Sequence, residues 1–319
     1  MSRRSGLIAA TLLAALALTA PLAQAQSGDA AKALNFFNSL VRPQGNQAAP
    51  ANPLTQMLGG GAAPAGNNAA LAGDLVQLLA KSVEQIDEPK EIEIGRQLSA
   101  VLLGSKPLHP DMKLQRYVNQ LGRWISLQSS RPQLPWSFAV LDDPGFNAFA
   151  APGGYVFVTK GLIDRVGNEA ELAGILAHEI THVTGKHHLK AIGAKARAGA
   201  LTQVISSQLN NNLGGMVSAQ LLALGRDLYS SGLDQGDEFE ADRNGVALAA
   251  RAGFDPYGLV AVLQQLRGAA ADDPLFALSL STHPPAQQRL DQVEVAMGSR
   301  LDAFAGKPSV SLAQRVGTP

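Results

Sequence analysis

The amino-acid sequence predicts a mostly helical α+β domain that contains one small β-sheet. Apolar residues recur three and four positions apart in long stretches of the chain, which is the period of an amphipathic helix. Only the segments 136–141 and 155–159 alternate at a period of two, and Pro-Gly pairs interrupt the chain between them. We therefore expect two or three short strands between an earlier and a later group of helices.

The first 73 residues are expected to lie outside this domain. Residues 1–25 combine a basic start, the apolar run from Leu7 to Ala20 and a final Ala-Gln-Ala, the three parts of a cleavable secretory signal. The apolar run is shorter than the ~20 residues that span a bilayer, so cleavage before Gln26 is predicted instead of anchoring. Residues 26–73 are rich in Ala, Gly, Asn, Gln and Pro and predict a flexible leader.

Charge and cysteine content narrow the class of protein. The chain has 26 basic and 26 acidic residues, and removal of Arg3 and Arg4 with the signal leaves 24 against 26, or −2. A near-neutral chain has no basic stripe, so no nucleic-acid partner is expected. Without cysteine the chain forms no disulfides and has no site for lipid attachment after the signal. We expect a periplasmic protein, not a lipoprotein, whose mature chain has no transmembrane segment.

The folded domain is expected over residues 74–304, followed by a loose tail at 305–319. Helices are predicted, in order, over 75–83, 89–103, 111–127, 171–183, 188–210, 216–228, 237–252, 256–266 and 285–297. Asp111 or Pro110 caps the third helix, and Gly253 ends the helix over 237–252. The buried stripe predicted for the third helix is Leu114, Tyr117, Val118, Leu121 and Trp124.

A histidine pair in the helix over 171–183 points to a metal site. His178 and His182 are four residues apart, so their imidazoles lie one turn apart on one helix face and can reach one metal ion. Glu179 projects beside that position, where a carboxylate can take a proton from water. Zinc hydrolases use this arrangement, so a zinc-dependent peptidase is the leading prediction. The alternative is that so short a match arose by chance.

Two residues compete to be the third protein ligand that a catalytic zinc requires. Residues 178–188 read His-Glu-x-x-His-x-x-Gly-x-x-His, the metzincin string, which would make His188 the ligand. Glu238 and Asp242 are four residues apart on a later helix, so one carboxylate could bind metal while the other accepts a hydrogen bond from a ligand imidazole. Spacing alone leaves both alternatives open.

Several motifs, in their order along residues 88 to 300, resemble the Ste24/HtpX-type M48 family of zinc metallopeptidases, specifically its soluble periplasmic members. These motifs are the segments 136–144, 147–162, 178–182, 238–242 and 281–284. The first Glu of Glu-x-x-Ala-Asp is the third zinc ligand in that family, which implies Glu238 here. The resemblance also implies a zincin-like fold in which an edge strand borders the active-site cleft. His187 and His188 are then interpreted as a polar helix boundary.

Further residues receive roles from the chemistry of their side chains and backbone, and some of these roles are also implied by the same resemblance. A Pro-Gly-Gly break would leave the strand after it at the sheet edge, where an extended substrate can pair with free backbone groups; an ordinary hairpin turn is the alternative. The predicted substrate-binding residues are Asn147, Ala148, Pro152, Gly153, Gly154 and Tyr155. In similar proteins a histidine corresponding to His283 approaches the zinc and can occupy the water position. We therefore expect His283 either to cap the metal in a resting state or to help stabilise the transition state. Arg289 could be a charge partner for an oxyanion or for an active-site acid.

The sequence therefore predicts an endopeptidase with one Zn²⁺ per chain, in which Glu179 is the general base. The resemblance implies exposed, misfolded or unassembled periplasmic polypeptides as substrates. It also suggests peripheral association with the envelope membrane or with outer-membrane assembly proteins. Two alternatives stay open: a chaperone-like polypeptide-binding protein whose zinc site is closed by His283, and a metzincin-like secreted protease that uses His188.

Overall fold

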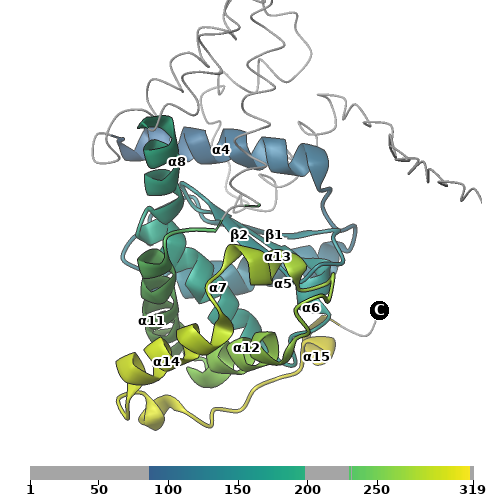
Figure 1. Ribbon diagram of the computed structural model, residues 1–319. Coiled ribbons are helices and arrows are strands. Elements are labelled where there is room, and N and C mark those ends of the chain that lie inside the picture. The colour runs from purple at the N-terminus through teal and green to yellow at the C-terminus, as the bar shows by residue number, and fades with distance from the viewer. Residues whose placement is uncertain (1–85, 198–229, 231, 317–319) are drawn as a thin grey trace, which may run out of the picture.

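The computed structural model describes residues 86–197, 230 and 232–316, which form helices packed around a three-stranded sheet (Figure 1). The predicted mostly helical α+β fold is confirmed. The predicted signal and leader, the helices over 75–83 and 216–228, and the end of the helix over 188–210 lie outside the described residues. In the described part of the chain, none of the helices combines the length and apolar character needed to cross a bilayer.

The sheet consists of β1 (Ser137–Leu141), β2 (Ala148–Ala151) and β3 (Tyr155–Thr159), in the order β1-β3-β2. β3 pairs in parallel with β1 and forms an antiparallel hairpin with β2. The turn at 152–154 includes Gly153 at a φ of 77°. β3 is therefore the central strand, and the prediction that the strand after Pro-Gly-Gly forms an edge is wrong. The edge strand next to the later helices is β2.

Helices cover both faces of this sheet, because alternate side chains of each strand point to opposite faces. The face toward α5 (Met112–Ser126) and α7 (Glu169–Thr184) carries Phe138, Val140, Val156 and Val158. The face toward α4 (Glu88–Ser105) carries Ala139, Leu141, Tyr155 and Phe157. The Asp111 side chain caps α5 as predicted. Trp124, predicted to be buried on α5, is instead 55% exposed, and its indole N–H donates to the carbonyl of Ala252.

α7 is the central helix of the molecule and is buried along almost its whole length. Its neighbours are α11 (Gln235–Arg251) and α12 (Tyr257–Gly268), and α8 (His187–Arg197) follows it after a short turn. α11 and α7 approach so closely that a side chain at Gly245 would lie 2.9 Å from the backbone nitrogen of His178. This contact fixes the distance between the helix that carries both predicted histidine ligands and the helix that carries Glu238.

The remaining elements complete the helical side of the domain. They are α6 (Lys160–Ile163), α13 (Ala277–Thr282), α14 (Ala286–Met297), a 3-10 turn over Asp302–Phe304 and α15 (Leu312–Val316). Gly253 follows α11 at a φ of 100°, which agrees with its predicted role as helix terminator. α6, α13 and α15 are too short to produce a clear periodic pattern in the sequence.

The prediction of a loose tail after residue 304 is wrong for the described part of that tail. Leu312 of α15 is buried, and the backbone N–H of Glu169 at the start of α7 donates to the carbonyl of Val310. The Glu169 carboxylate also accepts a hydrogen bond from Arg315. The first N–H groups of a helix lack partners within the helix. The tail supplies one of these partners and so packs against the N-terminus of α7.

Candidate metal centre and active site

α7 brings the two predicted histidine ligands together inside the protein. The side chain of Asn168 caps the helix, and the apolar neighbours of the histidines hold its inner face against the sheet and α12. His178 and His182 are both buried, and their Nε2 atoms lie 2.9 Å apart. The helical spacing in the sequence therefore predicted this pair of imidazoles correctly.

α11 adds a carboxylate to the pair. The Asp234 side chain caps this helix and places Glu238 in its first turn. The two carboxylate oxygens of Glu238 lie 3.7 Å from His178 Nε2 and 3.7 Å from His182 Nε2, and the side chain is buried. Within the described residues, Glu238 Oε2 has no hydrogen-bond partner. A buried carboxylate oxygen without a partner is unfavourable unless a cation neutralises it.

The three groups fit a zinc ion by chemistry and by spacing. Zn²⁺ takes imidazole nitrogen and carboxylate oxygen at about 2.0–2.2 Å, and two ligands at that distance in a tetrahedral site are about 3.3 Å apart. The separations among His178, His182 and Glu238 are 2.9, 3.7 and 3.7 Å, on either side of that value. His188, the competing candidate, is buried nearby but packs edge-on against Phe149, with 5.0 Å between ring centroids.

A buried ion pair supports one of the two histidines. Asp242 Oδ1 lies 2.9 Å from His178 Nδ1, and the Asp242 carboxylate accepts two hydrogen bonds from Arg289, at 2.8 and 2.6 Å. Burial alone would raise the pKa of Asp242, but the Arg289 charge and hydrogen bonds hold that pKa well below its ordinary value. Asp242 is therefore anionic and fixes the orientation of His178, while Arg289 is the charge partner of this acid.

Glu179 has a side chain that is 3% exposed, and burial raises its pKa to about 7. A carboxyl group with a pKa near neutrality can accept a proton and release it again at physiological pH. The neighbouring Glu238 carboxylate also raises this pKa, while His178 lowers it. Glu179 therefore has the acid–base properties that a catalytic proton carrier needs.

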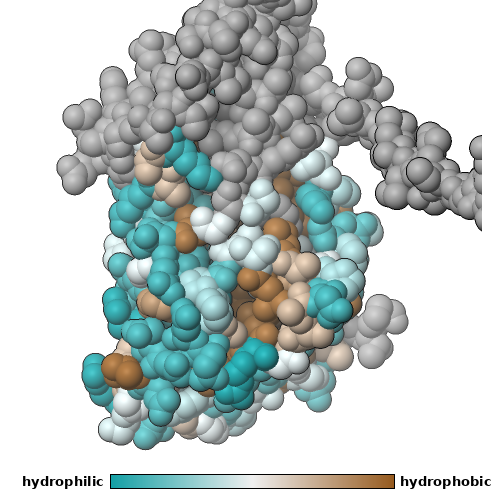
Figure 2. Space-filling model, in the orientation of Figure 1, coloured by the Kyte–Doolittle hydropathy of each residue, from teal (hydrophilic) through white to brown (hydrophobic). Residues whose placement is uncertain are grey.

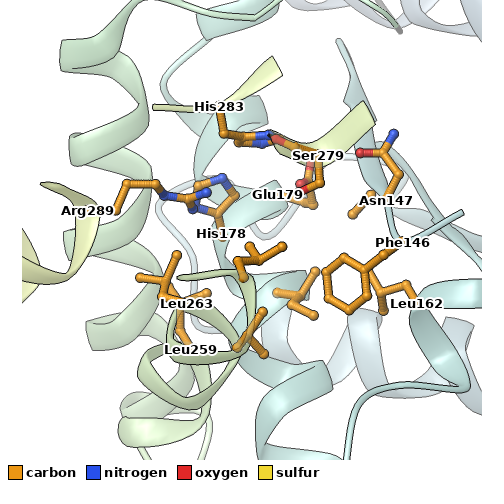
Figure 3. Close-up of a pocket in the computed structure, with 14 residues that line it drawn as sticks. Phe146, Asn147, Leu162, His178, Glu179, Leu259, Leu263, Ser279, His283 and Arg289 are labelled. Atoms are coloured by element: carbon orange, nitrogen blue, oxygen red, sulfur yellow. Dashed lines mark hydrogen bonds between the residues drawn. The ribbon is translucent and has the colours of Figure 1, made fainter. Parts of the chain in front are cut away.

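Two small cavities flank Glu179. The first, of about 40 Å³, has a polar side formed by His178, Glu179, His283 and Arg289 (Figure 3). Its opposite side is apolar and is lined by Phe146, Leu162, Ile175, Leu259, Val262, Leu263 and Leu266. Figure 2 shows hydrophobic surface around a hollow at the place that α12 and α13 occupy in Figure 1. The second cavity, of about 20 Å³, is lined by His182, His188, Glu238 and His283 on its polar side.

The predicted substrate-binding residues separate into two groups. Asn147 and Ala148, at the start of the edge strand β2, line both cavities. Pro152, Gly153, Gly154 and Tyr155 line neither, because the hairpin turn lies at the other end of the strands, against α4. The Gly153 N–H donates to the carboxylate of Glu91 on that helix. Only the first two residues therefore lie where a substrate could meet Glu179.

His283, at the end of α13, faces the same centre from the opposite side. Its Nδ1 lies 3.1 Å from the carbonyl oxygen of Ser279, and its Nε2 lies 3.7 Å from Glu238 Oε2. A carbonyl oxygen only accepts hydrogen bonds, so Nδ1 carries the proton and Nε2 carries the lone pair. Burial lowers the pKa of His283 and favours this neutral form. The unprotonated Nε2 of His283 therefore points toward Glu238 and His178, and one ligand atom of each of the three residues lies within 4.8 Å of the others.

His187 was not recognised from the sequence as part of the site. A helix does begin at His187, as the predicted polar boundary requires, but the side chain is not at the surface: it is fully buried, and its Nδ1 lies 3.0 Å from His182 Nδ1. The available signal was its place five residues after His182 and two after Gly185. Residues five apart in a continuous helix do not share a face. The contact between His187 and His182 depends instead on the turn between α7 and α8.

Comparisons with known proteins find similarity to peptidases. The model of Peptidase family M48 matches residues 110–296. The beta-barrel assembly-enhancing protease of Escherichia coli K12 is 33% identical over 208 residues, which cover 63% of this chain and 42% of that protein. The mitochondrial metalloendopeptidase OMA1 of Schizosaccharomyces pombe is 31% identical over 178 residues, 56% of this chain and 51% of the relative. A protease HtpX homolog from Salinibacter ruber is 30% identical over 183 residues, 48% and 64% of the two chains.

Proposed function

The chain belongs to peptidase family M48, and on this basis we propose that it is a zinc-dependent endopeptidase. The observation that carries the proposal is the buried convergence of two imidazoles and one carboxylate beside Glu179, whose pKa is raised to about 7. In this proposal His178, His182 and Glu238 hold one Zn²⁺. A bound Zn²⁺ supplies Lewis acidity, which makes water more acidic and polarises a carbonyl oxygen.

The chain's own residues would move the protons and hold the ligands. Glu179 takes a proton from the attacking water and transfers it to the nitrogen of the leaving amine. Asp242 holds His178 in one orientation, and Arg289 keeps Asp242 ionised. The edge of β2 near Ala148 is the proposed place for the substrate backbone, because β2 is an edge strand and an extended peptide can add to a sheet edge without a side-chain sequence requirement.

We further propose that the protein acts on exposed, misfolded or unassembled polypeptides in the periplasm. The signal-like residues 1–25 support export, and we place the start of the peptidase domain near residue 74, after a low-complexity segment over 26–73. The similarity to a beta-barrel assembly-enhancing protease supports a connection to outer-membrane assembly, either through substrates or through peripheral association. The described 3-10 turn and α15 suggest that the domain extends past residue 304.

Cleavage of an unfolded polypeptide is the direct test of the proposal. We expect the purified protein to cut such a substrate at internal bonds with Zn²⁺ present, to stop after treatment with a chelator, and to recover when Zn²⁺ is restored. Mass spectrometry of the products identifies the bonds that are cut. Cleavage that continues unchanged in the chelator would contradict a metallopeptidase.

A chaperone-like role with a closed zinc site is the second candidate, and the position of His283 favours it. The lone pair of His283 Nε2 faces Glu238, where it could take the position of the attacking water. A His283→Ala substitution is therefore expected to increase cleavage several-fold, because it opens that position. The measurement is the initial rate at saturating Zn²⁺, with His109→Ala, which lines neither cavity, as control. A decrease would instead assign His283 to transition-state stabilisation, and an unchanged rate with unchanged zinc coordination would contradict both roles.

A further inference from the structure

The turn between α7 and α8 folds the chain back so that His187 lies against α7. Lys186 adopts a left-handed conformation with a φ of 56°, and its ammonium lies 3.4 Å from the buried carboxylate of Glu91 on α4. A side chain at Gly185 would come within 2.2 Å of His187 Nε2. Glycine thus leaves the space that the imidazole occupies, and His187 is fully buried although it begins a new helix.

The contact that this turn creates has a defined hydrogen-bond direction. His182 Nδ1 and His187 Nδ1 lie 3.0 Å apart, so one of the two nitrogens must donate and the other accept. The proposed role of His182 as a metal ligand uses the lone pair of its Nε2. The proton of His182 is then on Nδ1, and His187 Nδ1 must accept it. The proton of His187 is consequently on its own Nε2.

The Nε2 of His187 faces a pair of carboxylates on α11. Asp237 Oδ1 lies at 3.6 Å and Glu240 Oε1 at 3.9 Å, and Nε2 has no direct hydrogen-bond partner among the described residues. Lys190 from α8 approaches the same Asp237 oxygen at 3.8 Å. The negative charge of the two carboxylates stabilises a protonated Nε2 and therefore stabilises the tautomer in which Nδ1 is the acceptor.

We propose that His187 is a positioning residue for the metal ligand His182: it accepts the Nδ1 proton, fixes the ring orientation and directs the lone pair of Nε2 at the metal. The inference rests on the proposed ligand set and deepens it. The two histidine ligands are then supported differently. His178 has an anionic carboxylate at 2.9 Å, whereas His182 has a neutral imidazole with two carboxylates behind it.

The same residues could be taken for a second metal site, since one ligand atom each of His187, Asp237 and Glu240 lies within 4.8 Å of the others. The lone-pair count argues against this interpretation. A neutral imidazole has one lone pair, and His187 uses it to accept the proton of His182. The ammonium of Lys190 beside Asp237 further disfavours a cation there. If the wild-type protein binds a second metal ion at His187, the proposal is contradicted, and the experiment below includes this outcome.

The experiment compares the Zn²⁺ affinity of the full-length protein with that of two His187 variants, by competition with a chromophoric chelator. His187→Leu removes the acceptor and is expected to weaken binding about 10–100-fold, as is usual when the outer partner of a ligand histidine is lost. His187→Gln keeps one acceptor and one donor and is expected to stay within a few-fold of the wild type. Thermal unfolding of the metal-free forms separates a loss of affinity from a loss of folding.

Three results would overturn the proposal. The first is a His187→Leu variant that folds and binds Zn²⁺ as tightly as the wild type, and the second is a His187→Gln variant that binds Zn²⁺ as weakly as His187→Leu. The third is a wild type that binds two metal equivalents and a variant, of either kind, that binds only one. If His187→Leu does not fold, the Asp237→Asn/Glu240→Gln double variant replaces it. This variant should bind Zn²⁺ several-fold more weakly, and wild-type affinity would equally overturn the proposal. A wild type that binds no Zn²⁺ or cuts no polypeptide would instead contradict the proposed function.

Discussion

Replacement of Glu179 by glutamine is expected to lower the rate of peptide cleavage about 10²–10⁴-fold, the usual contribution of a general acid–base group. Glutamine keeps the shape of the side chain but cannot take a proton from water. The measurement is kcat/KM for an unfolded polypeptide, with the zinc content of both proteins determined in parallel. Because Glu179 is not one of the proposed ligands, the zinc content should not change.

The same substitution is expected to stabilise the metal-free protein in a pH-dependent manner. Burial raises the pKa of Glu179 from 4.5 to about 7, so the folded state binds its proton more tightly than the unfolded state does. Glu179 therefore makes folding progressively less favourable as the pH rises from about 4.5 to 7, by on the order of 3 kcal/mol above pH 8. Urea unfolding should show Glu179→Gln to be more stable at pH 8 and equal to the wild type below pH 4.5.

These two measurements also decide between catalysis and polypeptide holding. A protein that only holds polypeptides would give the same result with Glu179 or glutamine in every assay of activity. A folded, zinc-loaded Glu179→Gln variant that cleaves as fast as the wild type would contradict the assigned base. Stability that is unchanged at pH 8 would contradict the shifted pKa, independently of the catalytic result.

Substitution of Glu238 by alanine is expected to remove bound zinc, whereas His188→Ala is expected to keep it. The Glu238 oxygens lie 3.7 Å from the Nε2 atoms of both ligand histidines, while the His188 ring packs against Phe149. Loss of a direct ligand should weaken binding by more than the 10–100-fold that is typical of an outer partner. Zinc content after dialysis and Zn²⁺ affinity by chelator competition measure the difference.

His188→Ala serves as the matched comparison, because His188 is also buried and lines the second cavity. The substitution can change the cleavage rate through that cavity without changing metal affinity. The reverse pattern, with zinc retained in Glu238→Ala and lost in His188→Ala, would favour the metzincin-like alternative. Equal loss of zinc from both variants would contradict the assignment of Glu238 as the only third ligand, and equally that of His188.

Features that depend on one helix were predictable from the sequence. Side chains four residues apart on a helix share a face regardless of the surrounding fold, so His178 and His182 could be paired from their spacing. The same rule placed Glu238 and Asp242 together on α11. Their joining to the histidine pair required a second helix at a particular distance. The spacing of residues along the sequence does not give the distance between two helices, so the prediction that Glu238 is the third ligand came from resemblance to a family.

Features that depend on how elements pack against one another were missed. The alternation of β3 predicted a strand but not its central place, which follows from parallel pairing with β1. Trp124 fits the apolar stripe of α5, yet its indole extends over the end of α11 to reach Ala252. His187 reaches His182 only because the turn at Gly185 folds back. Each outcome is set by contacts between segments that are distant in sequence or separated by a turn.

The close contact at Gly245 has a thermodynamic consequence for metal uptake. α11 lies against the backbone of His178 with no intervening side chain, so folding itself brings Glu238 to the two histidines. The loss of conformational entropy needed to assemble three ligands then belongs to the folding equilibrium and is not subtracted from the binding free energy. A site whose ligands are already in place before the metal binds therefore has a higher metal affinity than one whose ligands must first be ordered. Gly245 therefore contributes to metal retention because its lack of a side chain allows α11 to pack directly against α7.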